Sequence, residues 1–237
     1  MTNEISTWLQ FWNQEQSIYV SRRHLESNYR SIADDFLTLE PNGHGKTLLD
    51  YGCGDALATP RFVAAGYHVI LFDPAELMQQ KARRFEGKNV AVYHTLDEIP
   101  AQTADIILIV SVLQYLSKIE TREMLKRLRS FLKPHGVLYV ADVVPPDASM
   151  IRDVYSLLSA GLHNGFFFAA LVGLAETFFS DYRSLREKAG FTTWAESDFL
   201  ALLSQNGLAG ERLEKNIGHN QGRMTFRIVI AASSSLG

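Results

Sequence analysis

The middle of the chain alternates short apolar runs with longer amphipathic segments, a pattern that predicts strands alternating with helices. The apolar runs are rich in Val, Ile and Leu and lack polar alternation, as strands buried on both faces of a parallel sheet require. Strands joined through helices connect in parallel by right-handed crossovers. Five strands are predicted, at residues 47–52, 67–73, 89–94, 104–110 and 137–144.

The segments between these strands carry start and stop signals for helices. Thr59 is expected to cap a helix that has Pro60 at its first position. Residues 74–87 predict a second helix, which a glycine ends. A third helix opens on the capping-box pair Ser117 and Glu120. Each predicted helix therefore lies between two predicted strands.

The chain closes with one more helix and two more strands. The helix covers residues 197–207, with Ser197 or Asp198 as its cap. Strands at 209–218 and 223–232 are separated by a tight loop, so they form a hairpin and the last strand runs antiparallel to its neighbour. The sequence therefore predicts an α/β fold, a doubly wound, Rossmann-like sheet of seven mostly parallel strands.

Three parts of the chain differ in their pattern. Residues 1–45 predict aromatic-rich helices that form an N-terminal cap, and residues 46–145 with 196–237 predict the sheet core. Residues 146–195 predict a helical cap insertion. Its uninterrupted apolar part, 165–175, is shorter than the roughly 20 residues that span a bilayer. We therefore expect it to cover a ligand, with a membrane-facing patch as the alternative.

Composition narrows the class of protein. At 237 residues, with 46% apolar and 21% charged residues, the chain predicts one soluble domain with an inserted cap. The net charge of -3 gives no basic field for a nucleic acid. The single cysteine, Cys53, excludes an intrachain disulfide and a cysteine cluster for a metal. The N-terminus lacks the pattern of a signal peptide, so a cytoplasmic location is expected.

Two glycines and one aspartate mark a predicted ligand site. Gly52 and Gly54 follow the first strand, and Asp73 ends the second. Ligands of such sheets bind at the carboxyl ends of the strands, where glycine lets the main chain turn and a carboxylate can accept hydrogen bonds from a ribose diol. A dinucleotide fingerprint needs a third glycine where this chain has Leu57. The pattern therefore favours a cofactor with a single nucleoside.

Four motifs in this order carry a resemblance to a known family. They are "LLDYGCGDA", "VILFDPAELM", "ADIILIVSVLQYL" and "LKPHGVLYVAD". With the final hairpin they resemble class I S-adenosylmethionine-dependent methyltransferases over residues 47–142 and 196–232. The resemblance implies S-adenosylmethionine as the cofactor and a methyl-transfer reaction.

The resemblance also implies how the cofactor lies. The loop from Asp50 to Gly54 would hold its methionine part, Asp73 its ribose, and the segments after the second and third strands its adenine. The family often has a third glycine in this loop, where this chain has Asp55 and Ala56. The implied cofactor-binding residues are Asp50, Gly52, Cys53, Gly54, Asp73, Pro74, Leu77, Thr95, Leu96, Val110 and Ser111.

The residues after the fourth strand narrow the class of acceptor. The "VSVLQYL" segment lacks the "NPP" pattern of amino methylation on DNA or glutamine, and it lacks a catalytic cysteine. We expect Gln114 and Tyr115 to form walls for a small-molecule, sugar or lipid-linked acceptor, methylated at oxygen. N-methylation and cyclopropane-type transfer to an acyl chain are enzymatic alternatives. The non-enzymatic alternative is a cofactor-binding domain that stabilises a partner protein.

The loop of the final hairpin supplies the first candidate for a general base. It lies at the carboxyl edge of the predicted sheet, and His219 within it can take a proton near neutral pH. Asn220 is expected to orient His219, and Arg223 to hold an anionic group of the acceptor. His163 in the insertion and Asp142 at the end of the fifth strand are the alternative bases.

Overall fold

A seven-stranded sheet forms the centre of the computed structural model, which describes residues 3–13, 19, 21–148, 158–159, 161–162 and 192–232. The strand order is β3-β2-β1-β4-β5-β7-β6, and β7 runs antiparallel to both of its neighbours. The predicted fold class is therefore confirmed. The strands are β1 Thr47–Tyr51, β2 His68–Phe72, β3 Val90–Val92, β4 Ala104–Val110, β5 Leu132–Val143, β6 Leu208–Arg212 and β7 Met224–Ile230.

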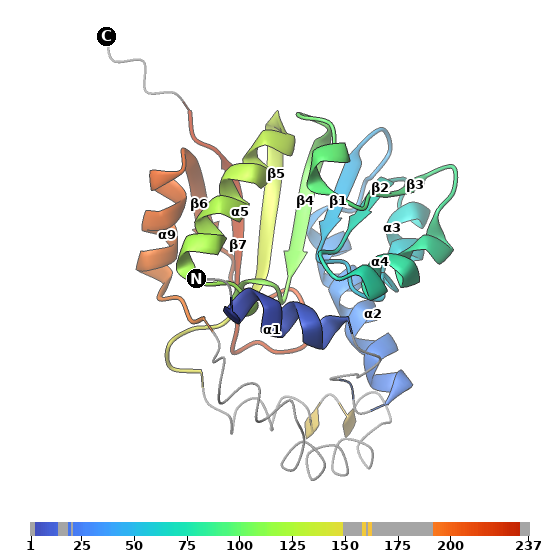
Figure 1. The fold of residues 1–237 in the computed structure, drawn as a ribbon, viewed down its shortest axis with the longest axis horizontal. Coiled ribbons are helices and arrows are strands. Elements are labelled where there is room, and N and C mark those ends of the chain that lie inside the picture. Colours follow the sequence, from blue (N-terminus) through green and yellow to red (C-terminus); the bar gives the residue numbers. More distant parts are fainter. Residues whose placement is uncertain are drawn as a thin grey trace.

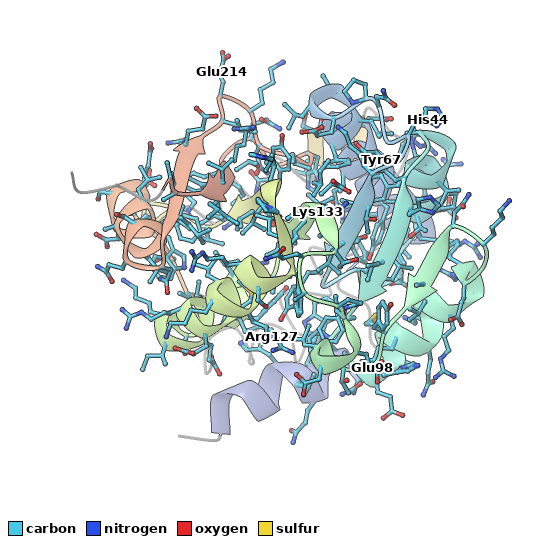
Figure 2. The ribbon with its side chains drawn as sticks, turned by 90° about the horizontal axis from the view of Figure 1, so that it is seen from above. His44, Tyr67, Glu98, Arg127, Lys133 and Glu214 are labelled. Atoms are coloured by element: carbon cyan, nitrogen blue, oxygen red, sulfur yellow. The ribbon has the colours of Figure 1, made fainter. Side chains whose placement is uncertain are left out.

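Helices cover both faces of this sheet (Figure 1). The α-helices are α1 Asn3–Trp12, α2 Arg22–Leu39, α3 Thr59–Ala64, α4 Glu76–Ala82, α5 Lys118–Phe131 and α9 Glu196–Gln205. Three short 3-10 helices are η1 Arg83–Phe85, η2 Leu96–Glu98 and η3 Leu113–Tyr115. Figure 2 shows α5, with Arg127 labelled, on the opposite side of the sheet from α2.

Alternate residues of each strand build two separate cores, because successive side chains of a strand point to opposite faces. Leu49 of β1 and Ile107 of β4 belong to the core under α5 and α9. Their neighbours Leu48 and Leu108 belong to the core under α2 and α3. All four side chains are fully buried or nearly so. Burial on both faces explains why the strands carry continuous apolar runs.

Local signals at the helix starts were reliable in one case and misleading in two. The capping box is confirmed, since Ser117 and Glu120 exchange hydrogen bonds between side chain and backbone at the start of α5. The predicted cap at Thr59 is wrong: Thr59 lies inside α3, whose cap position is Ala58. Ala195, rather than a polar side chain, precedes α9. Neither of these two helices has a side-chain cap.

The final hairpin has a longer connection than predicted. β6 ends at Arg212 and β7 begins at Met224, so residues 213–223 form the loop. This loop lies at the carboxyl end of β6, which pairs antiparallel with β7 and therefore runs parallel to β5. The predicted position of His219 at that edge of the sheet is confirmed, although the tight turn is not.

Helix α1 crosses the carboxyl ends of the parallel strands, as Figure 1 shows in dark blue below β4. Asn13, which follows α1, accepts a hydrogen bond from the backbone N–H of Leu77 at 3.2 Å. Most of the predicted cap at 146–195 lies outside the described residues. Among the described residues, no helix has the length and hydrophobicity that crossing a membrane requires.

Candidate active site

A cavity of about 440 Å³ lies at the carboxyl ends of the parallel strands, under α1. It has two ends. The glycine loop after β1 and the ends of β2 and β4 form one, and α1, the start of α2, η3 and the 213–223 loop form the other. Residues that are far apart in the sequence therefore meet in one space.

The glycine loop can take its shape only without side chains at two positions. Gly52 has a φ of +74° and Gly54 a φ of +54°, in the left-handed region. A Cβ atom at Gly52 would stand 2.5 Å from the side chain of Val112. A Cβ atom at Gly54 would stand 2.5 Å from the hydroxyl oxygen of Tyr29. The loop is thus held tightly between α2 and the end of β4.

Tyr29 closes this loop from α2, a contact that the sequence did not reveal. Its hydroxyl accepts a hydrogen bond from the backbone N–H of Asp55 at 2.8 Å and donates one to the carbonyl of Cys53 at 3.2 Å. Burial raises the pKa of Tyr29 well above its usual value, which keeps the hydroxyl protonated. The hydroxyl can therefore bridge both sides of the loop.

Asp73 ties the glycine loop to the start of α4. One carboxylate oxygen accepts the backbone N–H of Gly54 at 2.9 Å, and the other accepts that of Ala75 at 2.8 Å. Gln79 donates to the backbone carbonyl of Asp73 at 2.7 Å. Each carboxylate oxygen has more than one acceptor direction, so Asp73 can still accept hydrogen bonds from a ligand in the cavity.

Two buried carboxyl groups, those of Asp50 and Asp73, lie at the ends of the neighbouring strands β1 and β2. Burial raises the pKa of Asp50 to about 7, and the charge of Asp73 adds to the rise. Burial also raises the pKa of Asp73 to about 6, against the two backbone N–H groups that favour its charge. Among the described residues, none donates a hydrogen bond to the Asp50 side chain. Asp50 is therefore available to a cationic ligand.

Cys53 lies in the same loop but lacks the environment of a reactive thiol. It is 3% exposed, and burial, together with the charges of Asp50 and Asp73, raises the pKa of its thiol well above the usual value. The thiolate, which is the nucleophilic form, is thus disfavoured. Cys53 contributes to the shape of the loop.

The start of α2 carries a polar group of side chains to the other end of the cavity. Tyr19, His24 and Asn28 all line the cavity. The amide nitrogen of Asn28 lies 3.2 Å from the hydroxyl oxygen of Tyr19, and its amide oxygen lies 3.2 Å from Nδ1 of His219. Burial and the nearby His219 lower the pKa of His24 to about 4, so its imidazole is neutral at physiological pH.

A buried asparagine shapes the loop that carries His219. Asn216, which is 4% exposed, accepts hydrogen bonds on its amide oxygen from the backbone N–H of Asp142 at 3.0 Å and from Thr225 at 2.8 Å. Its amide nitrogen donates to the carbonyl of Asn220 at 3.0 Å. Asn216 thereby fixes the loop to the end of β5.

Ser111 and Asp142 meet at the ends of β4 and β5. The Ser111 hydroxyl donates to the Asp142 carboxylate at 2.6 Å. Both residues have a φ of +59°, which is uncommon for residues with side chains. Such conformations persist where the surroundings hold them, and they concentrate at functional sites. Both side chains line the cavity.

Most of the residues predicted from the sequence line this cavity. From the cofactor set these are Asp50, Gly52, Cys53, Gly54, Asp73, Pro74, Val110 and Ser111, and from the acceptor and catalytic sets Gln114, Tyr115, Asp142, His219 and Arg223. The cavity also has a wall of α1 residues that the sequence did not assign: Trp8, Leu9 and Trp12. The prediction of His163 lies outside the described residues.

Four predicted residues do not line the cavity. Leu77 points its backbone N–H at Asn13, and Met78 takes its place beside Pro74. Thr95 and Leu96 lie away because β3 ends at Val92 and the chain turns into η2. Asn220 does not line it either: its side chain accepts the backbone N–H of Gly222, and Asn28 lies against the imidazole of His219.

The family model of the methyltransferase domain matches residues 21–209, which is most of the chain. The chain belongs to this family. With the strand order described above, this protein is a class I S-adenosylmethionine-dependent methyltransferase.

Known proteins that act on different acceptors are similar to this chain in sequence or in fold. The N-terminal Xaa-Pro-Lys N-methyltransferase 1 of Rattus norvegicus is 29% identical over 147 residues, which are 58% of this chain and 66% of the relative. The DhpI complex with S-adenosylhomocysteine has a TM-score of 0.63 at 13% identity and covers 98% of both chains. The mitomycin 7-O-methyltransferase MmcR has a TM-score of 0.56 at 20% identity, over 88% of this chain and 53% of its own.

The geometry of the cavity fits S-adenosylmethionine. Asp50 offers a carboxylate that no described residue occupies, as a cationic ammonium group requires. Asp73 offers acceptors to a pair of ribose hydroxyls, and the two side-chain-free positions let a ligand approach the loop. The cofactor supplies an electrophilic methyl group when it is bound.

Proposed function

We propose that the protein methylates a hydroxyl oxygen of a small-molecule acceptor, with His219 as the general base. The observation that carries this proposal is the distance of 3.2 Å between Nδ1 of His219 and the amide oxygen of Asn28. Both residues line the cavity that the glycine loop also lines. The amide nitrogen of Asn28 donates to Tyr19, so its oxygen faces His219. An amide oxygen only accepts hydrogen bonds, so this contact favours the tautomer with the proton on Nδ1, in which Nε2 is the basic nitrogen.

The remaining residues position the two substrates in this proposal. Asp50 faces the ammonium group of the methionine part, and Asp73 holds the ribose. The acceptor's hydroxyl proton passes to Nε2 of His219 as its oxygen takes the methyl group and the bond from that methyl to sulfur breaks. Gln114 and Tyr115 border the acceptor, and the buried guanidinium of Arg223 attracts an anionic substituent.

N-methylation is the second candidate. The similarity to the rat N-terminal N-methyltransferase favours it, whereas the mitomycin enzyme of the same fold methylates oxygen. The fold thus serves both reactions, and local residues must decide between them. A neutral amine is nucleophilic through its nitrogen lone pair, so its methylation needs little help from a base. The imidazole arranged by Asn28 favours the hydroxyl acceptor.

Transfer of an isotopically labelled methyl group tests the proposal. The protein is incubated with methyl-labelled S-adenosylmethionine and, separately, with a small-molecule extract and a protein extract. We expect label in small molecules, in products one methylene group heavier than their precursors, with the methyl group on oxygen in the fragment spectra. Label on the N-termini of proteins, or on nitrogen of a small molecule, would decide for N-methylation.

Cofactor affinity should rise with pH because of Asp50. Without a ligand, the pKa of about 7 leaves this carboxyl group half protonated near neutrality, and an ammonium group binds only the ionised form. Below pH 7 each unit of acidification should weaken S-adenosylhomocysteine binding by up to about tenfold, with a proton released on binding. Calorimetry in two buffers of different ionisation enthalpy measures both quantities.

The variant Asp50→Asn provides the control for this pH dependence. It should bind more weakly and lose the slope between pH 6 and 8, where Asp73, with a pKa of about 6, is mostly ionised. A parent protein whose affinity stays constant over this interval would show that Asp50 does not face the ammonium group.

A further inference from the structure

The end of the cavity formed by α1, the start of α2, η3 and the 213–223 loop is called the acceptor end. Three aromatic side chains form one of its walls. Trp8 and Trp12 come from α1 and Tyr115 from η3, and we call these three residues the aromatic wall. The ring centroids of Trp8 and Tyr115 are 4.6 Å apart, and those of Trp12 and Tyr115 are 5.7 Å apart. Rings at these distances support one another, so together they present a continuous apolar surface to the cavity.

The position of this wall is fixed from both ends. Asn13 binds the backbone of Leu77 beside the cofactor end, and Phe11 packs edge-on against Trp8 and Trp12. Trp8 is 5% exposed, whereas Trp12 and Tyr115 are only half-buried although both face the cavity. These two rings therefore keep apolar surface that a bound molecule can cover.

Polar side chains also line this end of the cavity, among them Tyr19, His24 and Asn28 at or near the start of α2. His219 and Arg223 come from the 213–223 loop, and Asp142 from the end of β5. Gln114 is 7% exposed, and its amide oxygen has no hydrogen-bond partner among the described residues. A buried amide without a partner is costly, and a ligand that carries an N–H or O–H group can pair with it. The site thus combines an apolar wall with a protic edge.

We infer that the acceptor is a flat, conjugated ring system that carries a hydroxyl group and an anionic substituent. This inference rests on the proposed function and names its substrate class. One ring face would lie on the aromatic wall, with the hydroxyl toward His219 and the anionic group toward Arg223. Stacking on an aromatic surface adds roughly two- to tenfold in affinity per ring contact beyond the burial of area.

Other classes of acceptor use these groups less well. A sugar can pack only a C–H face on Trp8 and Trp12, and each of its hydroxyl groups that enters the apolar part of the cavity loses hydrogen bonds to water. A flexible acyl chain gains from burial but not from ring stacking, and it loses rotational freedom when bound. A rigid flat ring gains from both burial and ring stacking.

A matched set of probes tests the inference with S-adenosylhomocysteine already bound. The probes are a hydroxynaphthoate, its fully hydrogenated counterpart and ω-hydroxydecanoate, which share a hydroxyl and a carboxylate and differ in the flatness and rigidity of the carbon frame. Calorimetry gives each affinity. We expect the hydroxynaphthoate to bind at least tenfold more tightly than either of the others.

Tryptophan fluorescence adds a local readout. The chain has three tryptophans, and Trp194 is buried outside the cavity. In a Trp194→Phe background, emission comes from Trp8 and Trp12, so a ring that stacks on the wall should quench it. The saturated and open-chain probes should leave the emission nearly unchanged.

Two variants on α1 separate the effect of the aromatic wall from any effect on the folding of the helix. Trp12→Leu should lower the affinity for hydroxynaphthoate about tenfold and leave that for its hydrogenated counterpart unchanged. Gln10→Ala alters an exposed residue that does not line the cavity, so it should preserve the difference between the probes. S-adenosylhomocysteine affinity should stay constant in both.

The outcomes distinguish this inference from the proposed function. If S-adenosylhomocysteine binds but the saturated or open-chain probe binds as tightly as the flat one, the inference is wrong and methyl transfer to another class of small molecule stands. If none of the probes binds to the S-adenosylhomocysteine complex, the inference is also wrong. If methyl label reaches only proteins, the proposed small-molecule acceptor is wrong, and the inference about its chemical class is wrong with it.

Discussion

We expect His219→Ala to lower the turnover of a hydroxyl acceptor by about a hundredfold to ten-thousandfold, the range typical of a positioned general base. The reason is geometric. Asn28 lies 3.2 Å from Nδ1 of the imidazole and orients the ring, which lines the cavity. The substitution leaves the glycine loop and Asp73 in place. The affinity for S-adenosylhomocysteine should therefore stay the same, as calorimetry can measure.

The pH profile gives this prediction a second readout. The neutral imidazole is the base, so the rate of the parent protein should rise with pH as the imidazole loses its proton. The His219→Ala variant should lose this rise. His44→Ala is a matched control, since His44 is exposed just before β1 at the opposite edge of the sheet (Figure 2).

Full turnover in His219→Ala would contradict the assignment. It would transfer the role to Asp142, which faces the same cavity, or indicate an amine acceptor that needs no base. Asn28→Ala discriminates further, because it keeps the base and removes the group that orients it. If His219 acts as proposed, this variant should lose turnover without losing the rise of rate with pH.

The sheet was predictable because its information is local. The central parallel strands are buried on both faces, so runs such as Ile106 to Ile109 are apolar throughout, as a parallel sheet covered by helices requires. The glycine loop was predictable for a similar reason, since Gly52 and Gly54 follow the end of β1 and need positive φ. These features depend on residues close together in sequence.

The acceptor end of the cavity was predictable only in part. The periodicity of α2 indicates that His24, Asn28 and Ile32 share a face, but not which edge of the sheet that face meets. Tyr29 reaches the glycine loop across 24 positions of sequence, and Asn28 reaches His219 across 191. Such contacts depend on how helices dock on the sheet, and a single sequence carries no local signal for docking.

The 213–223 loop shows how side-chain hydrogen bonds displaced a strand prediction. Residues 213–218 were predicted to extend β6, yet Asn216 turns toward Asp142 and Thr225. Asparagine readily replaces backbone pairing with hydrogen bonds of its own side chain. The loop is therefore long enough to place His219 against Asn28.

Asp73→Ala should produce the largest loss of cofactor affinity. The carboxylate is positioned for ribose hydroxyls, and hydrogen bonds to a charged group contribute about 1.5–3 kcal/mol, or roughly ten- to 150-fold in affinity. The same carboxylate accepts the backbone N–H groups of Gly54 and Ala75, so its removal also loosens the loop. A measured loss in this variant alone would therefore mix two effects.

A cycle of two ligands and two proteins separates these effects. S-adenosylhomocysteine is compared with an analogue that lacks both ribose hydroxyls, in the parent protein and in Asp73→Ala. Removing the hydroxyls should weaken binding to the parent by about 1.5–3 kcal/mol and barely change binding to the variant. Tyr29→Phe is the control: it loosens the loop without touching the ribose, so the cost of removing the hydroxyls should persist. An equal cost in the parent and in Asp73→Ala would leave Asp73 as a structural anchor of the loop and place the ribose elsewhere.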